Sequence, residues 1–113
     1  MRFIMFVCVA DQAHVPAEDT VVPDVDDWAN TLDASGVRIM GERLAGSSDA
    51  RTVRVRGGET VITDGPFAET KEVIAGFDIL ECASLKEAIA VAAAHPMAYT
   101  HMIEVRSVVS GPF

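Results

Sequence analysis

The side chains best suited to chemistry are a carboxylate, Asp64, and an imidazole, His95. A histidine titrates near neutral pH and a carboxylate can orient its ring, which is what proton transfer on a small molecule requires. The two residues are therefore a candidate catalytic pair. A simpler role stays open for each: Asp64 could bond its own backbone in a turn, and His95 could be a cation at the C-terminal end of a helix.

A dense polar turn follows Asp64 in the string DGPFAETKE, residues 64–72. Its side chains predict a polar pocket or contacts between subunits, and the alternative is surface ion pairs worth well under ~1 kcal/mol each. Arg54 and Arg56 share one face of a predicted strand. They could bind an anion there, or they could simply form the solvent-exposed face of a hairpin. The candidate ligand-binding residues are Arg54, Phe67, Glu69, Lys71 and Glu72.

The histidines and cysteines show no metal-ligand spacing, and the chain has neither a glycine-rich phosphate loop nor a GxSxG motif. We therefore expect no metal and no cofactor. Cys8 and Cys82 fall in predicted strands, and buried reduced thiols are the default for that placement.

Composition narrows the class of protein further. The chain has 113 residues, which predicts one domain spanning residues 1–113 with a core of its own. Its net charge of −8 repels phosphate backbones, so we expect no direct binding to nucleic acid. The apolar N-terminus, residues 1–10, is interpreted as a first strand rather than a signal peptide, and no run approaches the ~20 apolar residues of a membrane helix. These features predict a cytoplasmic protein that does not enter membranes.

The elements follow the order β-α-β, an inserted hairpin, then β-α-β. A glycine-rich turn at Gly57-Gly58-Glu59 separates two alternating runs and predicts the hairpin. Asp24 is a candidate helix N-cap with Gly36 as the C-terminal stop, and Ser84 and Glu87 form a capping box for the second helix, which is expected to stop at His95-Pro96. The sequence thus predicts a ferredoxin-like α+β fold, with strands at residues 3–10, 37–44, 73–82 and 102–109.

Three of the predicted strands carry apolar side chains on both faces. In the first strand Phe3 and Met5 point one way while Ile4 and Phe6 point the other. Two helices can cover only one face of the sheet, and a large exposed apolar face is unusual for a monomer. The sequence therefore predicts a two-fold homodimer packed sheet against sheet.

The hairpin with DGPFAETKE, the strand Gly76-Phe77-Asp78, the AAAHP helix end and the closing IEVR resemble the DGPF-domain, YCII-related family. The resemblance covers nearly the whole chain. It implies a dimeric α/β-barrel of ferredoxin-like subunits whose function is mostly uncharacterised. Some relatives occur beside or fused to extracytoplasmic-function sigma factors. Others are small-molecule enzymes, or look like them, with a His/Asp pair in a cleft.

This chain departs from the enzyme-like branch in one respect. That branch calls for a histidine on the first helix, and residues 24–35 contain none. His95 before Pro96 matches the DGPF-type pattern, whereas an aspartate commonly precedes that proline in the enzyme-like branch. The sequence therefore favours a dimeric small-molecule-binding or regulatory module, with a sigma factor as a candidate partner. The alternative is a lyase- or hydrolase-like enzyme that uses Asp64 and His95, with Arg54 as an anion anchor.

Overall fold

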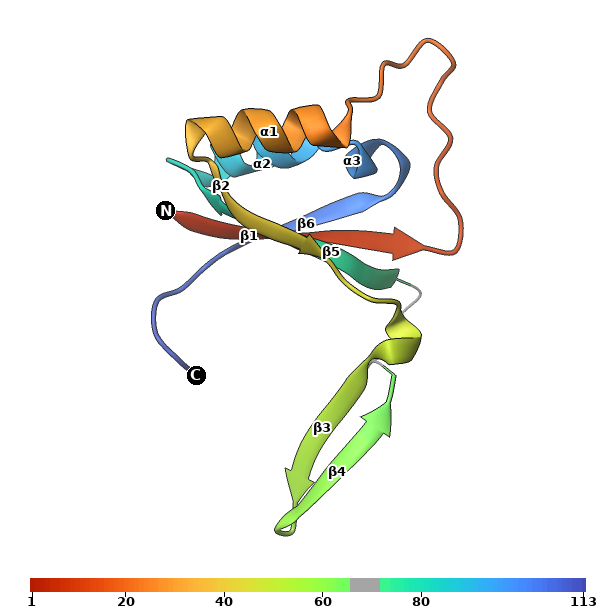
Figure 1. Cartoon of the computed structure of the whole chain (residues 1–113), viewed down its shortest axis with the longest axis vertical. Helices are drawn as coiled ribbons and strands as arrows, with labels where there is room; N and C mark the ends of the chain where they lie inside the picture. The colour runs from red at the N-terminus through yellow and green to blue at the C-terminus, as the bar shows by residue number, and fades with distance from the viewer. Residues whose placement is uncertain (66–71) are drawn as a thin grey trace.

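The computed structural model describes residues 1–65 and 72–113. A four-stranded sheet carries helices on one face, and a separate two-stranded hairpin projects away from it (Figure 1). The strands are β1 (Arg2–Ala10), β2 (Arg38–Arg43), β3 (Arg51–Arg56), β4 (Glu59–Asp64), β5 (Glu72–Glu81) and β6 (Met102–Ser107). The helices are α1 (Val25–Ser35), α2 (Leu85–Ala93) and the short α3 (Met97–Thr100), and a single 3₁₀ turn covers Ser47–Asp49.

The main sheet has the order β2-β5-β1-β6, and every neighbouring pair is antiparallel. This mixed α+β architecture is compatible with the predicted ferredoxin-like fold. The register shifts between Val7 and Cys8, where β1 passes Gly76 of β5. Gly76 also lies against β2, because a β-carbon there would stand 3.0 Å from the carbonyl oxygen of Glu42. A glycine inside a strand often marks such a bulge or close approach, and Gly76 has both.

The caps of α1 form as the sequence predicts. The Asp24 carboxylate accepts hydrogen bonds from the backbone N–H groups of Asp26 and Asp27, at 2.9 and 3.0 Å. These donors would otherwise have no partner inside the helix. Gly36 ends the helix with φ of +77°, a conformation that glycine adopts without strain.

The second helix differs from its prediction in two details. Ser84 accepts from the backbone N–H of Glu87 as expected, but the Glu87 carboxylate bonds the N–H of Ala83 rather than that of Ser84. A short helix, α3, also begins directly after Pro96, where the sequence predicts only the end of the second helix. Proline lacks an N–H donor but fits a first helical turn, so it ends one helix and allows the next to begin.

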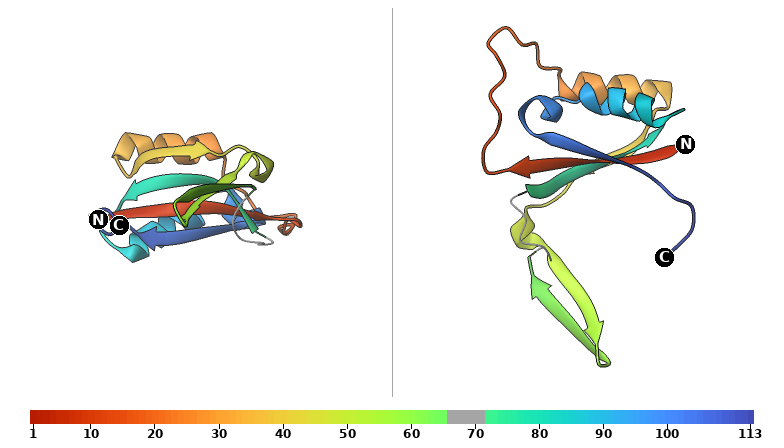
Figure 2. Two further views of the ribbon diagram at one scale, coloured as in Figure 1. Left: turned by 90° about the horizontal axis from the view of Figure 1, so that it is seen from below. Right: turned by 180° about the vertical axis from the view of Figure 1, so that it is seen from behind.

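The hairpin is a two-residue turn rather than the predicted three-residue one, because Glu59 already pairs with Arg56. Gly57 and Gly58 both have positive φ, of 59° and 77°, which is what a tight hairpin turn requires. The views in Figures 1 and 2 agree that the hairpin extends away from the helices.

The core lies between the helices and one face of the sheet. Phe3, Met5 and Leu80 are fully buried there, and Trp28 of α1 packs against them. Cys82 belongs to this cluster, and the predicted buried thiols are confirmed for both Cys8 and Cys82. Burial raises the pKa of the Cys82 thiol, so that thiol stays protonated at neutral pH.

The other face of the sheet has no helix over it in the views of Figures 1 and 2. Met40, Ile79 and Ile4 lie side by side across three strands on this face, as the register shows. Met40 is 47% exposed, and Ile74 and Met102 are 46% and 44% exposed. Strand β1 is thus apolar on both sides, as predicted, while the expected dimer over the open face stays a prediction.

In the described part of the chain, none of the helices has the length and apolar character needed to cross a bilayer.

Candidate functional site

A cavity of about 590 Å³ opens between α1, the β2–β5 half of the sheet and the chain that follows α2. This volume is within the range typical of small-molecule sites. Apolar side chains make up much of its wall, among them Val7, Val25, Trp28, Ala29 and Met97. Four titratable or charged side chains also contribute to the lining: Arg38, Arg43, Asp78 and His95. The cavity therefore combines an apolar wall with a small polar group, which is the usual composition of a ligand pocket.

His95 is only 6% exposed, and two contacts fix its ring. The ring meets Trp28 edge to face, with centroids 4.6 Å apart and planes at 73°. Its Nδ1 accepts the backbone N–H of Met97 at 3.0 Å. Trp28 is held in turn by its indole N–H, which donates to the carbonyl of Val91 at 3.0 Å. The imidazole therefore has one orientation and one neutral tautomer, with its proton on Nε2.

The Nε2 atom of His95 has no hydrogen-bond partner among residues 1–65 and 72–113. No fully buried side-chain nitrogen or oxygen of the described residues lacks a partner. Nε2 must therefore keep some accessible surface, and the cavity that His95 lines provides it. Burial, and secondarily the nearby Arg38 charge, lower the pKa of His95, so the ring is neutral at pH 7. The result is an N–H donor that faces the cavity.

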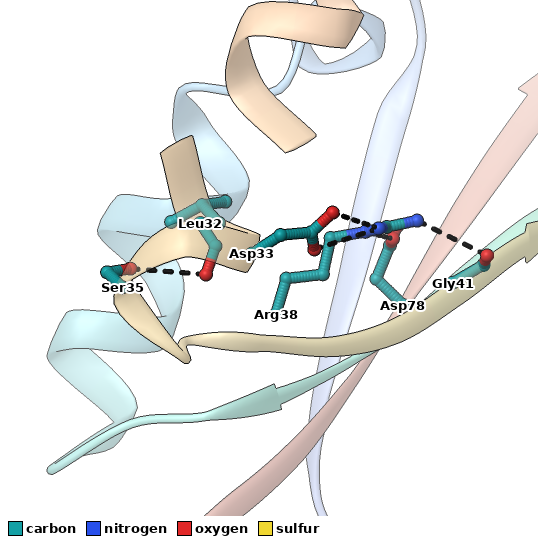
Figure 3. Close-up of polar contacts among 6 residues, drawn as sticks. All are labelled: Leu32, Asp33, Ser35, Arg38, Gly41 and Asp78. Atoms are coloured by element: carbon teal, nitrogen blue, oxygen red, sulfur yellow. Dashed lines mark hydrogen bonds and ion pairs between the residues drawn. The ribbon is translucent and has the colours of Figure 1, made fainter. Parts of the chain in front are cut away.

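Arg38 joins α1 to the sheet through all three of its guanidinium nitrogens (Figure 3). Its Nε donates to Asp78 at 2.7 Å, and one terminal nitrogen donates to both oxygens of Asp33 at 3.0 and 3.2 Å. The other terminal nitrogen donates to the carbonyl of Gly41 at 3.2 Å. The guanidinium of Arg38 is thus held in place by protein acceptors, and its charge is balanced by Asp33 and Asp78.

Asp78 is 6% exposed in the middle of an apolar strand. Burial raises the pKa of its carboxyl group, and the hydrogen bond from Arg38 opposes that rise. Position 41 has to be glycine here, because a β-carbon at that place would collide with the Asp78 carboxylate. The Arg38–Asp78 ion pair can therefore form only with glycine at position 41, and all three residues line the cavity.

Arg43 is the other cation in the lining. It pairs with Gly76 across the sheet, two residues beyond the Gly41–Asp78 pair, so its side chain is on the same, helix-covered face. Gly76 has no side chain to fill the space opposite. In the described part of the chain the Arg43 guanidinium makes no hydrogen bond or ion pair, and the residue is exposed. Arg43 can therefore turn toward an occupant of the cavity.

The structure does not bring Asp64 and His95 together within one subunit. Asp64 ends β4 on the projecting hairpin, where its side chain is 86% exposed and pairs with Arg51 at 3.1 Å. His95 lies in the wall of the cavity beside the main sheet, and the carboxylate that shares this wall is Asp78. The interpretation of His95 as a cation at a helix end is wrong, because burial keeps the ring neutral. A joint role for Asp64 and His95 stays a prediction.

The remaining candidate ligand-binding residues are also apart from the cavity or undescribed. Arg54 is half-buried on β3 of the hairpin and does not line the cavity. Phe67, Glu69 and Lys71 lie outside the described residues. Glu72 is the first residue of β5.

Sequence reasoning missed Arg38, Arg43 and Asp78 as members of a site. One signal was present, since Asp78 interrupts the apolar run IAGFDIL. A carboxylate in such a strand is buried and needs a cation nearby. Which arginine supplies that cation depends on the pairing of β2 with β5, and spacing alone does not reveal it.

Among residues 1–65 and 72–113, no three histidine, cysteine or acidic side chains gather as a metal site would require.

The fold places the chain in the class of small antiparallel α+β domains. Within that class the chain belongs to the YCII-related domain family, whose model matches residues 1–111. A relative in Rhizobium meliloti (strain 1021), the uncharacterized protein R00369, is 53% identical over 47 residues. This match spans 42% of the present chain and 38% of that protein, which is less than half the length of either.

Proposed function

We propose that this protein binds a small organic molecule in the cavity between α1 and the β2–β5 half of the sheet, as a binding or regulatory module. The observation that carries the proposal is the state of His95. Its ring is nine-tenths buried and fixed on both sides, yet Nε2 has no partner in the described part of the chain. Because Nε2 keeps accessible surface in the cavity wall, its N–H can donate a hydrogen bond to an acceptor on a ligand.

The same geometry favours binding over base catalysis. A general base must offer an unprotonated nitrogen to its substrate. Here the nitrogen without a proton is Nδ1, which is occupied by the N–H of Met97. The nitrogen that faces the cavity carries the proton, so it supports donation of a hydrogen bond and not removal of a proton.

The test uses the single tryptophan, Trp28, which lines the cavity. A panel of small organic molecules is screened by quenching of Trp28 fluorescence, and hits are measured by calorimetry. Ala29→Phe should block binding because Ala29 lines the cavity, whereas Ala34→Phe, at an exposed position of the same helix, should leave binding intact. Equal binding in both variants, or no binding to the wild type, would contradict the proposal.

The enzyme alternative keeps Asp64 and His95 as an acid–base pair with Arg54 as the anion anchor. Asp64 and Arg54 are both on the hairpin, which does not line the cavity of the same chain. The enzyme alternative therefore requires the hairpin of a second copy to reach the cavity that contains His95. Turnover of small carboxylates or lactones, lost in Asp64→Asn and in His95→Ala, would support it. Unchanged ligand binding and turnover in both variants would end it.

The proposal includes two partners. A second copy of the chain is proposed to cover the open sheet face, and the support is the exposure of Met40, Ile74 and Met102 on that face. Association with a sigma factor is supported only by the resemblance to relatives that occur beside such factors. Copurification with an extracytoplasmic-function sigma factor of the same organism is its test, and absence of a stable complex with any such factor would refute it.

A further inference from the structure

We propose that the ligand of this cavity is a monocarboxylic acid with an apolar body, whose carboxylate pairs with Arg43 while an oxygen of the ligand accepts the N–H of His95 Nε2. The inference rests on the proposed small-molecule site and adds the chemical class of its occupant. It is carried by three features of the lining: a cation without a partner in the described residues, a fixed N–H donor and an apolar wall.

Arg43 supplies the cation. Its neighbour Arg38 is less suited to this role, because its nitrogens already donate to Asp33, Gly41 and Asp78 and the two carboxylates balance its charge. Arg43 is on the same face of the sheet, opposite Gly76, and makes no hydrogen bond or ion pair in the described part of the chain. A guanidinium presents a planar fork that matches a carboxylate with two parallel hydrogen bonds.

His95 supplies the second, orienting contact. Because Met97 occupies Nδ1, the neutral ring offers only a donor to the cavity, and a donor selects an acceptor oxygen on the ligand. A ligand that presents only donors would leave this N–H unpaired, at a cost that discriminates strongly against it.

The rest of the wall sets the charge and the body of the ligand. Trp28, Val7, Val25 and Met97 offer an apolar surface on which a hydrocarbon or aromatic group can pack. The Asp78 carboxylate also lines the cavity. A negative charge already present in the wall disfavours a dianion such as a phosphate monoester, so a single carboxylate is the charge that fits.

The experiment compares matched probes on the full chain by calorimetry: benzoate against benzamide, phenylacetate against phenylacetamide, and phenyl phosphate as the dianion. We expect the carboxylates to bind at least tenfold more tightly than their amides and than phenyl phosphate. Arg43→Gln should weaken carboxylate binding at least tenfold and Arg43→Lys less. Arg2→Gln, an exposed arginine on β1 that does not line the cavity, is the matched control and should change nothing.

A second readout does not depend on Arg43. Benzoate should shift the ¹⁵N resonance of His95 Nε2 far more than the ring resonances of the exposed His14. If amides bind as tightly as acids and Ala29→Phe blocks both, the cavity binds small molecules but the carboxylate inference is overturned. If no probe binds and neither Trp28 nor His95 responds, both the inference and the proposed function are overturned.

Discussion

The two faces of the main sheet are built from the same strands, and both are apolar, yet they differ in cover and in content. On the face under α1 and α2, Phe3, Met5 and Leu80 have no exposed surface. On the opposite face, Met40 and Ile74 remain nearly half exposed. Apolar sequence alone therefore does not decide burial, since burial also requires an element to lie over the side chains.

The faces also differ in their polar content. The covered face carries the Arg38–Asp78 pair, His95 and the cavity near its β2–β5 edge. The open face presents mainly apolar side chains in its middle, where Ile4 pairs with Ile79 and Phe6 with Phe77. The comparison indicates that the covered face is the one suited to recognising a small polar molecule, and the open face the one suited to association with another apolar surface.

The largest expected contrast comes from the same residue type on one strand. Phe3→Ala removes a fully buried ring and should lower the free energy of unfolding by about 3–5 kcal/mol. Phe6→Ala, on the open face, should lower it by about 1–2 kcal/mol in the isolated subunit, because the ring is half-buried. Urea unfolding at dilute protein concentration measures both. Equal losses would show that the two faces are equally packed.

The second contrast concerns the polar network of the covered face. Gly41→Ala places a β-carbon against the Asp78 carboxylate and should destabilise the fold by about 3 kcal/mol, since it disturbs a buried ion pair. Gly46→Ala is the control, because its β-carbon would meet only the Ser48 hydroxyl, at 3.9 Å. Thermal unfolding of both variants decides the matter, and a neutral Gly41→Ala would mean that Asp78 can move without loss.

The third contrast tests the open face. The wild type is expected to be a dimer at micromolar concentration, and Ile79→Glu should weaken association by at least about 1.4 kcal/mol, or tenfold, because it places a charge in the proposed interface. Val15→Glu, in an exposed loop, should leave the dimer intact. Size-exclusion chromatography with light scattering gives the masses. A wild type that is monomeric at that concentration would refute the proposed dimer.

The smallest effect is a dependence of stability on pH. The pKa of His95 is lowered by burial in the folded state, so the unfolded chain binds a proton more readily. Neutral His95 makes its full contribution to the free energy of unfolding above the pKa of the unfolded chain, about 6.5. That contribution is lost as the pH falls toward the lower pKa of the folded state. Asp78 has the opposite effect at more acidic pH: its pKa is raised in the folded state, so the folded chain binds a proton more readily and protonation of Asp78 favours folding.

His95→Asn should therefore flatten the loss of stability just below pH 6.5. Urea unfolding across that range gives the slopes. Parallel slopes in the wild type and His95→Asn would show that the buried ring does not titrate with folding.

Local patterns were sufficient for most of the fold. The caps at Asp24 and Ser84, the hairpin glycines and the two-sided apolar strand β1 each act through neighbouring residues, so their sequence signatures predicted them correctly. The helix after Pro96 was missed because a proline that ends one helix can also begin another. The site was harder to predict. His95 was singled out as a candidate catalytic residue and lies in the cavity wall, whereas the charged residues that share this wall come from β2 and β5, whose register is a long-range property.

The sequence by itself determined most of the elements, the two apolar faces of the sheet and the histidine before Pro96, because these are properties of near neighbours and of side-chain type. Only the tertiary structure decided that Arg38 bonds Asp78, that Arg43 stays without a partner in the described residues, and that His95 turns its N–H into a cavity. The physical reason is that hydrogen bonds and burial depend on groups brought together from distant parts of the chain.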